Sequence, residues 1–356
     1  MKAALLTNVR EIRIRDVPAP ELTCPKDVLL RIDAVGVCGS DIHYYSTGRV
    51  GARAITFPQT LGHECAGTVV SAGSAVQRLR VGQPVAIDPL IACGECDQCL
   101  GGREHTCRQQ RFLGYPGQAP GALAEYMVVP ARCCYPVPES MTPAQATLVE
   151  PLSVALHSRN IAPLSPDSRI AILGAGPIGL SVLLACRAAF GGLICYVTDL
   201  VEARLEATQR CGAHWTGNPD SKDVVRSISA LEPLGLDVVF ECAGKQETLD
   251  QAVSLLKPGG TLVIVGIPEL ERVSFDPHAL RRNELQVRNV RRQNKCTAEA
   301  IALIATGKID VDQLVTHRFA LAETGHAFDL VSRQGDGVIK ALIELQGLPL
   351  ASNPRC

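Results

Sequence analysis

The sequence predicts an α/β protein in which a β-rich, loop-rich domain accompanies a doubly wound parallel sheet. Down to about residue 130, short segments of alternating polar and apolar residues are separated by Gly and Pro, a pattern typical of half-buried strands joined by turns. From about residue 168, strand-like runs alternate with helical ones, which indicates parallel strands covered by helices on both faces. A length of 356 residues suits about two domains.

Composition argues against several classes of partner. The formal net charge is −1, with 46% hydrophobic and 20% charged residues, so the chain has no basic field for nucleic acid or anionic lipid. The N-terminus does not match a signal peptide, and glycines interrupt the uncharged run 170–186, which is too short to span a membrane. We therefore expect a cytoplasmic protein whose partners are small molecules or other subunits.

The stretch from Gly36 to Gly67 holds the first candidate site. Cys38, His63 and Glu64 are a thiol, an imidazole and a carboxylate, a set that suits zinc and leaves a fourth position open for water or substrate. Ser40, Asp41 and His43 lie beside the thiol in sequence. Such residues also occur by chance as a buried thiol, an ordinary histidine and a solvated acid.

A second metal motif lies in residues 91–107, with the spacing C-x2-C-x2-C-x7-C; its cysteines are Cys93, Cys96, Cys99 and Cys107. Four thiolates this close can surround one tetrahedral zinc ion. The bacterial iron–sulfur run places its fourth cysteine earlier and follows it with proline, whereas Arg108 follows here, so structural zinc is favoured. The other cysteines of the 15 are scattered and are interpreted as small buried hydrophobic residues.

A helical pattern begins near Met141 and carries Glu150 on an otherwise apolar stretch. A carboxylate buried there needs a partner. The alternative is an acid in the first turn of a helix, which the helix dipole favours.

A glycine loop between a strand and a helix indicates a dinucleotide site. The loop is Gly174-Ala175-Gly176-Pro177-Ile178-Gly179, and Asp199 ends the next strand. In such a loop the glycines permit a tight turn, a close approach of the pyrophosphate to the backbone, and close packing of the helix on the strand. The acid binds the ribose 2′-hydroxyl. The acid favours NAD over NADP. A glycine turn in another doubly wound domain is the alternative.

Three arginines have weaker assignments. Arg204, in the helix after Asp199, is either a contact for the adenine side of the cofactor or a surface charge. Arg291 and Arg292 lie where the chain would pass between domains, where paired arginines are usually solvated. The strand-like tail VIKALIELQ is expected to rejoin the first domain, and the edge of the sheet near TLVIVGI is expected to be an interface.

Together these motifs resemble the zinc-dependent medium-chain dehydrogenase/reductase family over essentially the whole chain, and within it the sorbitol and xylitol (polyol) dehydrogenases. The segments CGSDIHYYSTGRVG, LGHECAGTV and VEPLSVALHS carry the closer likeness. The resemblance implies a GroES-like catalytic domain over residues 1–156, a Rossmann NAD-binding domain over 157–289 and a return segment over 290–356, with the active site between the domains. It also implies a homo-oligomer, a tetramer.

By the same resemblance, Cys38, His63 and Glu64 hold the catalytic zinc. Glu150 is then a second carboxylate that bonds the metal-bound water or enters the coordination shell, and Asp41 orients His63.

The resemblance assigns the remaining site residues by position. Ser40 and His43 match the proton relay, and Tyr44, Phe112 and Arg292 match substrate-pocket positions. The cofactor-binding set becomes Gly174, Gly176, Pro177, Ile178, Gly179, Asp199 and Arg204. Gln293 departs from the aromatic residue usual after the arginine, and the loop FLGYPGQAPGALAEY departs from the animal sorbitol enzymes.

The function that follows is zinc-dependent, NAD-linked and reversible oxidation of a secondary alcohol of a polyol to the ketose. Zinc would lower the pKa of the substrate hydroxyl, and the nicotinamide would accept the hydride. One alternative is a zinc dehydrogenase of the same family that acts on a vicinal diol or on threonine. Another is a non-catalytic NAD-binding or redox-sensing protein, which has no need of an open zinc site.

Overall fold

A computed structural model describes residues 1–51, 53–268 and 270–345. The β-rich part is built on a seven-stranded sheet in the order β12-β8-β7-β3-β20-β19, with β11 also paired to β3. Its strands are β3 (Asp27–Gly36), β7 (Glu64–Ala72), β8 (Pro84–Ile87), β11 (Tyr126–Pro130), β12 (Cys134–Pro136), β19 (Val315–Ala320) and β20 (Lys340–Glu344). Inward-facing residues of β3 alternate with half-buried ones, as the alternating sequence predicts.

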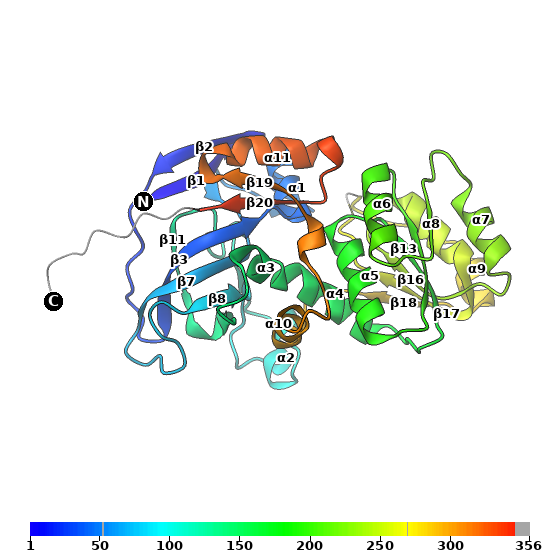
Figure 1. Cartoon of the computed structure of the whole chain (residues 1–356), viewed down its shortest axis with the longest axis horizontal. Coiled ribbons are helices and arrows are strands. Elements are labelled where there is room, and N and C mark those ends of the chain that lie inside the picture. Colours follow the sequence, from blue (N-terminus) through cyan, green and yellow to red (C-terminus); the bar gives the residue numbers. More distant parts are fainter. Residues whose placement is uncertain (52, 269, 346–356) are drawn as a thin grey trace, which may run out of the picture.

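The C-terminal segment completes this sheet. β20 pairs antiparallel with the end of β3, with Leu342 opposite Gly36, and parallel with β19. Figure 1 shows these red and orange strands beside the blue β3. The prediction that VIKALIELQ contains a strand returning to the first domain is therefore confirmed for Lys340–Glu344, while the last residue of that segment, 346, lies outside the described residues. Lys340, the first residue of the strand, is brought next to the Gly36–Gly67 region.

Smaller elements surround the sheet. They are the three-stranded sheet β2-β1-β6 (Glu11–Asp16, Lys2–Asn8, Gln59–Thr60), the hairpin β4-β5 (Arg49–Val50, Arg53–Ala54), the pair β9-β10 (Leu90–Ile91, Arg111–Phe112) and helices α1 (Gly39–Thr47), α2 (Asp97–Leu100) and α11 (Thr324–Ser332). Short 3-10 turns cover Glu104–Thr106, Ala131–Cys133, Asp312–Leu314, Leu321–Glu323 and Gly335–Gly337.

The second part is a six-stranded parallel sheet in the order β15-β14-β13-β16-β17-β18. The strands are β13 (Arg169–Leu173), β14 (Ile194–Thr198), β15 (Trp215–Gly217), β16 (Leu236–Glu241), β17 (Leu256–Ile264) and β18 (Gln286–Asn289). Numbered from its first strand, this order is 3-2-1-4-5-6, that of the Rossmann fold. The helices α5 (Pro177–Ala189), α6 (Glu202–Arg210), α7 (Val224–Leu231), α8 (Gln246–Leu255) and α9 (Pro277–Arg282) accompany it (Figure 1).

Two sequence predictions about this sheet are wrong. The strand near TLVIVGI is not an edge, because β17 pairs with β16 on one side and β18 on the other; β18 is the edge strand. β17 also begins at Leu256, before the Pro-Gly-Gly segment expected to be a turn, and its pairing with β16 shifts register there. Short strands such as β15 (Trp215–Gly217) and β18 (Gln286–Asn289) carry little periodic signal, so the sequence missed both of these strands.

Apolar helices fill the junction of the two parts. The single helical pattern after Met141 is two helices, α3 (Pro143–Thr147) and α4 (Val149–Ile161), which meet at Leu148. One continuous apolar cluster contains Ala66 of β7, Leu152 of α4, Leu180 of α5 and Ala300 of α10 (Thr297–Ala305). The active-site side chains that both parts supply are therefore held by one packed core. Within the described residues, no helix is long and apolar enough to cross a membrane.

Candidate active site

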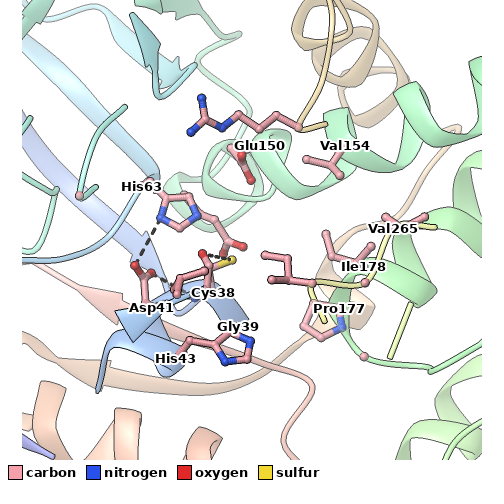
Figure 2. Close-up of a pocket in the computed structure, with 18 of the residues that line it drawn as sticks. Cys38, Gly39, Asp41, His43, His63, Glu150, Val154, Pro177, Ile178 and Val265 are labelled. Carbon is pink, nitrogen blue, oxygen red and sulfur yellow. Dashed lines mark hydrogen bonds and ion pairs between the residues drawn. The ribbon is translucent and has the colours of Figure 1, made fainter. Parts of the chain in front are cut away.

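A cavity of about 370 Å³ lies between the two sheets. The β-rich part contributes Cys38, Ser40, Asp41, His43, Tyr44, His63, Glu64, Phe112 and Glu150, and the Rossmann part contributes Gly176, Pro177 and Ile178. Figure 2 shows Pro177 and Ile178 across the cavity from Cys38. At its outer side, Arg49 of the β4-β5 hairpin lies 3.2 Å from Glu271 of the Rossmann part.

Cys38 and His63 meet on the floor of this cavity. Cys38 is the N-cap residue of α1, and His63 immediately precedes β7. His63 Nδ1 lies 3.4 Å from Asp41 Oδ1, and both side chains are buried. Asp41 therefore fixes the ring and leaves Nε2 for a metal, the arrangement usual for metal-binding histidines. Burial opposes charge on His63, but Asp41 and Cys38 outweigh it and raise the pKa of His63.

The carboxylate of Glu64 forms an ion pair with Lys340. Lys340 Nζ lies 2.8 Å from Glu64 Oε1 and 2.5 Å from Oε2, and it also donates to the carbonyl of Val37. The pair is buried, with 2% and 1% of the two side chains exposed. Gly36 provides the room, since a Cβ there would come within 2.2 Å of Glu64 Oε2. In the described chain, Cys38, His63 and Glu64 do not form a group whose ligand atoms all lie within 4.8 Å.

Glu150 is the second carboxylate of the cavity. It lies in the first turn of α4 and faces the same space as His63 (Figure 2). Burial raises the pKa of Glu150 to about 7, while His63 works in the opposite direction. A carboxylate in this position can accept a proton or bind a cation, so both sequence interpretations apply: Glu150 is an acid at a helix start, and it also faces the site.

The remaining predicted side chains also lie around the cavity. Ser40 Oγ is 3.4 Å from Cys38 Sγ, and His43 and Tyr44 follow on α1 and line the wall. The ring of Phe112 packs on His63, with 5.2 Å between ring centroids. The guanidinium of Arg292 stacks on the same Phe112 ring, 3.7 Å from its centroid.

Gln293, noted as a departure from the polyol dehydrogenases, points away from the cavity. It is buried, donates to Asp88 Oδ2 at 2.6 Å and accepts from the backbone N–H of Cys296. It therefore anchors the chain segment that carries Arg292.

The glycine loop has the geometry of a dinucleotide site. Gly174 adopts φ +100°, and a Cβ on Gly179 would lie 1.9 Å from the carbonyl oxygen of Gly174, so turn and packing require both glycines. A Cβ on Gly176 would have no protein atom closer than Arg204 at 4.0 Å. The open space beside Gly176, at the start of α5, is where a pyrophosphate fits.

Asp199 and Arg204 lie on the adjacent side of this loop. Asp199 accepts hydrogen bonds from the backbone N–H groups of Ala175 (2.7 Å) and Val201 (2.8 Å). Arg204 lies 3.9 Å from Asp199. It also donates to the carbonyl of Val338, from the segment that precedes β20. Gly174, Gly179, Asp199 and Arg204 do not line the cavity around Cys38; they would hold the distant end of a dinucleotide.

The four-cysteine loop forms a separate, closed group. The sulfur–sulfur distances are 3.5 Å for Cys93–Cys107, 3.6 Å for Cys96–Cys99 and 3.9 Å for both Cys93–Cys99 and Cys96–Cys107. A tetrahedral ion with Zn–S bonds of about 2.3 Å requires sulfurs about 3.8 Å apart. The four thiols therefore fit one structural zinc.

Among the cavity residues that sequence reasoning missed are two with polar groups, Lys340 and Tyr115. Lys340 was assigned only to a strand, although a lysine inside an apolar strand requires a partner. Tyr115 lines the wall and packs edge-on against Tyr44, with ring centroids 6.3 Å apart; nothing in its local sequence distinguishes it from a loop residue.

A Rossmann sheet that faces a thiol–imidazole pocket, with a four-cysteine lobe nearby, defines the class of zinc-binding, nucleotide-linked dehydrogenases. Residues 24–139 match the family model described as the alcohol dehydrogenase GroES-like domain, and residues 177–306 match the zinc-binding dehydrogenase model. With the full-length relatives below, these matches show that the chain belongs to the zinc-containing medium-chain dehydrogenase/reductase family. The predicted GroES-like and Rossmann fold classes are confirmed.

Relatives match over nearly the full length. The sorbitol dehydrogenase of Bacillus subtilis is 35% identical over 344 residues, which cover 96% of this chain and 97% of the relative. The L-idonate 5-dehydrogenase of Vitis vinifera is 34% identical, covering 96% of this chain and 94% of the relative. A crystal structure of a zinc-binding dehydrogenase from Sinorhizobium meliloti 1021 bound to NADP superposes with a TM-score of 0.88 at 36% identity, covering 96% and 98% of the two chains.

Proposed function

We propose that this zinc-dependent dehydrogenase carries out the reversible, NAD-linked oxidation of a secondary alcohol of a polyol to the ketose. The observation that supports this most is that Cys38, His63 and Glu150 face Pro177 and Ile178 across one cavity. A hydroxyl bound on one side would therefore lie next to a nicotinamide bound on the other. The names of the relatives include both a neutral polyol and a sugar acid, so the family alone leaves the substrate open.

In this proposal Cys38 and His63 hold the catalytic zinc, with Glu64 and Glu150 as the carboxylates at hand. A zinc ion there would lower the pKa of the substrate hydroxyl. Asp41 keeps His63 in the orientation that presents Nε2. Glu64 would have to leave Lys340 to reach the metal, whereas Glu150 already faces the cavity.

The chain's own residues then handle the proton. The hydroxyl proton passes to Ser40 Oγ and on to His43, both on α1 and both lining the cavity, or leaves through water beside Glu150. A nicotinamide held beside Pro177 and Ile178 would accept the hydride from the carbon that bears the hydroxyl, which would become a carbonyl. The apolar side chains of Val154, Ile178 and Val265 line the space between the two groups and would limit competition from water.

The preference for NAD rests on Asp199. Its carboxylate lies at the end of β14 and already accepts two backbone hydrogen bonds, so it stays in place where a 2′-phosphate would have to enter. Arg204 contacts the same carboxylate, but its guanidinium is directed to Val338. We also propose the division into residues 1–156, 157–289 and 290–356 on the strength of the two sheets.

The test is NADH formation with polyols, vicinal diols and threonine, supplied with NAD or NADP, before and after chelation and zinc restoration. We expect zinc-restored turnover of a polyol with NAD. Cys38→Ser should abolish that turnover, and Cys24→Ser, on an exposed cysteine, is the matched control. Turnover of only diols or threonine would reject the polyol assignment. Turnover of no hydroxyl compound with zinc restored would reject the whole proposal.

A further inference from the structure

Three arginines that the proposed mechanism does not use as metal or proton groups lie in the outer wall of the cavity or beside it. Arg291 and Arg292 line it on the segment that crosses from β18 to α10. Arg53 approaches from the β4-β5 hairpin, with its guanidinium 5.6 Å from the centroid of the Tyr115 ring. One hairpin residue and two adjacent crossover residues thus place positive charge on one side of the cavity.

Tyr115 connects the three. It lines the cavity, lies under Arg53, and is close enough to Arg292 to affect the pKa of that guanidinium, as Arg291 does. Burial and the neighbouring Arg291 lower the pKa of Arg292 to about 9. The charges on this wall therefore repel one another and would be stabilised by a negative group between them.

Two of the arginines, Arg292 and Arg53, are also arranged to present donors. Arg292 is stacked on Phe112 and held by Gln110 Oε1 at 2.7 Å, and Arg53 lies over a ring. A guanidinium stacked on an aromatic ring keeps its N–H edge available, and that edge matches the paired oxygens of a carboxylate or phosphate.

Among these arginines, nearby acids compensate Arg292 in part, since Glu150 and Asp88 act to raise its pKa against burial and Arg291. Asp41 is paired with His63 and Glu64 with Lys340, so Glu150 is the carboxylate left near the floor. Within the described part of the chain, none of Arg53, Arg291 and Arg292 has a carboxylate within 4.0 Å. Arg53 and Arg291 are exposed to solvent, so with a neutral substrate they stay hydrated and unpaired, whereas an anionic substrate can pair with them.

We infer that the substrate is an open-chain polyhydroxylated compound with a terminal anionic group, a carboxylate or a phosphate, which Arg53, Arg291 and Arg292 bind. This inference rests on the proposed function and narrows its substrate class. The reacting hydroxyl lies at the floor near Cys38 and His63, and the anionic end lies at the wall toward the mouth. Tyr44 belongs to the same wall, and its buried hydroxyl has no hydrogen-bond partner in the described structure, so it is available to a substrate hydroxyl between the two ends.

The experiment compares three substrates of matched chain length on the zinc-loaded enzyme with NAD: a neutral polyol, the corresponding aldonate and the corresponding polyol phosphate. We expect kcat/KM to be about tenfold or more higher for one of the anions at low ionic strength, and this advantage to shrink in about 0.5 M KCl. The variants are Arg53→Met and Arg291→Met. Arg226→Met, an exposed arginine on α7 of the Rossmann part, is the control.

Each arginine variant should raise KM for the preferred anion about tenfold or more, with little change in kcat or in any of the constants for the neutral polyol. Titration calorimetry of the same ligands with the NADH-loaded protein gives a readout that does not depend on turnover, and it should show the same loss. A preference for the aldonate identifies a carboxylate, and a preference for the phosphate identifies a phosphate.

Three results would overturn the inference while leaving the proposed function intact. The first is that the enzyme turns over the neutral polyol with the same kcat/KM as both anions. The second is that neither arginine variant alters the preference for an anion. The third is that Arg291→Met raises KM for NAD and leaves KM for the substrate unchanged. The last would assign Arg291 to the cofactor. Failure of all three substrates with zinc restored would instead reject the proposed function.

Discussion

Replacing Lys340 by methionine tests the buried ion pair beside the metal site. Lys340 Nζ lies 2.8 and 2.5 Å from the two oxygens of Glu64, and 2% and 1% of the two side chains are exposed. Lys340→Met keeps most of the volume but leaves a buried carboxylate without its charge partner. Breaking a buried pair in this way costs about 3–5 kcal/mol. The double variant Lys340→Met with Glu64→Gln removes both charges and should recover about half of that loss.

The measurement is urea unfolding followed by far-UV circular dichroism, together with hydrogen exchange of peptides that cover β7 and β20. Fluorescence would be a poor probe, because the single tryptophan, Trp215, lies in the Rossmann sheet. Lys257→Met is the matched control. Its salt bridge with Asp237 is 2.6 Å long, but 44% and 26% of the two side chains are exposed, so its loss should cost about 1 kcal/mol or less.

The same variants decide what Glu64 does. If Glu64 stays with Lys340, Lys340→Met should lose the same free energy of unfolding with zinc bound and after chelation. If Glu64 ligates zinc once released, the zinc-loaded variant should lose less than the chelated one, because the metal then compensates the carboxylate. A loss below about 1 kcal/mol in both states would refute the buried ion pair.

Three further predictions concern other parts of the molecule. Cys99→Ser should lower the zinc content, measured by elemental analysis, by about one ion per chain, while the control Cys24→Ser should leave it unchanged. An unchanged zinc content in Cys99→Ser would contradict the structural zinc site. Burial lowers the pKa of His157 to about 4. His157 is therefore protonated at a higher pH in the unfolded chain than in the folded one, and the free energy of unfolding falls as pH decreases from about 6.5 to 4. His157→Gln should reduce that loss by about 1–2 kcal/mol after allowance for solvent screening, and identical pH profiles in urea unfolding would argue against it. Val287→Lys, on the exposed edge strand β18, should shift the sedimentation of the protein from the tetramer expected by resemblance to smaller species. The control is Leu234→Lys, at an exposed loop residue, which should leave sedimentation unchanged. An unchanged mass for Val287→Lys would place the interface elsewhere.

Local spacing is what made the fold class and two motifs predictable. The four cysteines lie within 15 consecutive residues, and the glycine loop is flanked by its own strand and helix. In both cases the groups that act together are neighbours in sequence, so the chain needs little tertiary information to bring them together. The structure accordingly shows the four sulfurs at bonding spacing and both required glycines in strained or crowded positions.

The contacts that tune the site could not be predicted in this way. Lys340 and Glu64 are 276 positions apart, and Gln293 and Asp88 are 205 apart. No periodicity links such residues, and only the return of β20 to β3 brings the first pair together. The direction of Gln293 also shows that a residue next to the pocket-lining Arg292 can be turned into the core by two hydrogen bonds.

The hydrogen bonds from Arg204 to Val338 affect how the two halves of the molecule can move. They are buried and join α6 of the Rossmann part to the segment before β20, whereas the Arg49–Glu271 contact at the mouth lies between side chains that are 53% and 83% exposed. An exposed pair contributes about 1 kcal/mol or less, so the mouth is the side that separates at least cost. We expect the halves to pivot about the Arg204 end, which would admit the polyol at the mouth while the adenosine end of the dinucleotide stays enclosed.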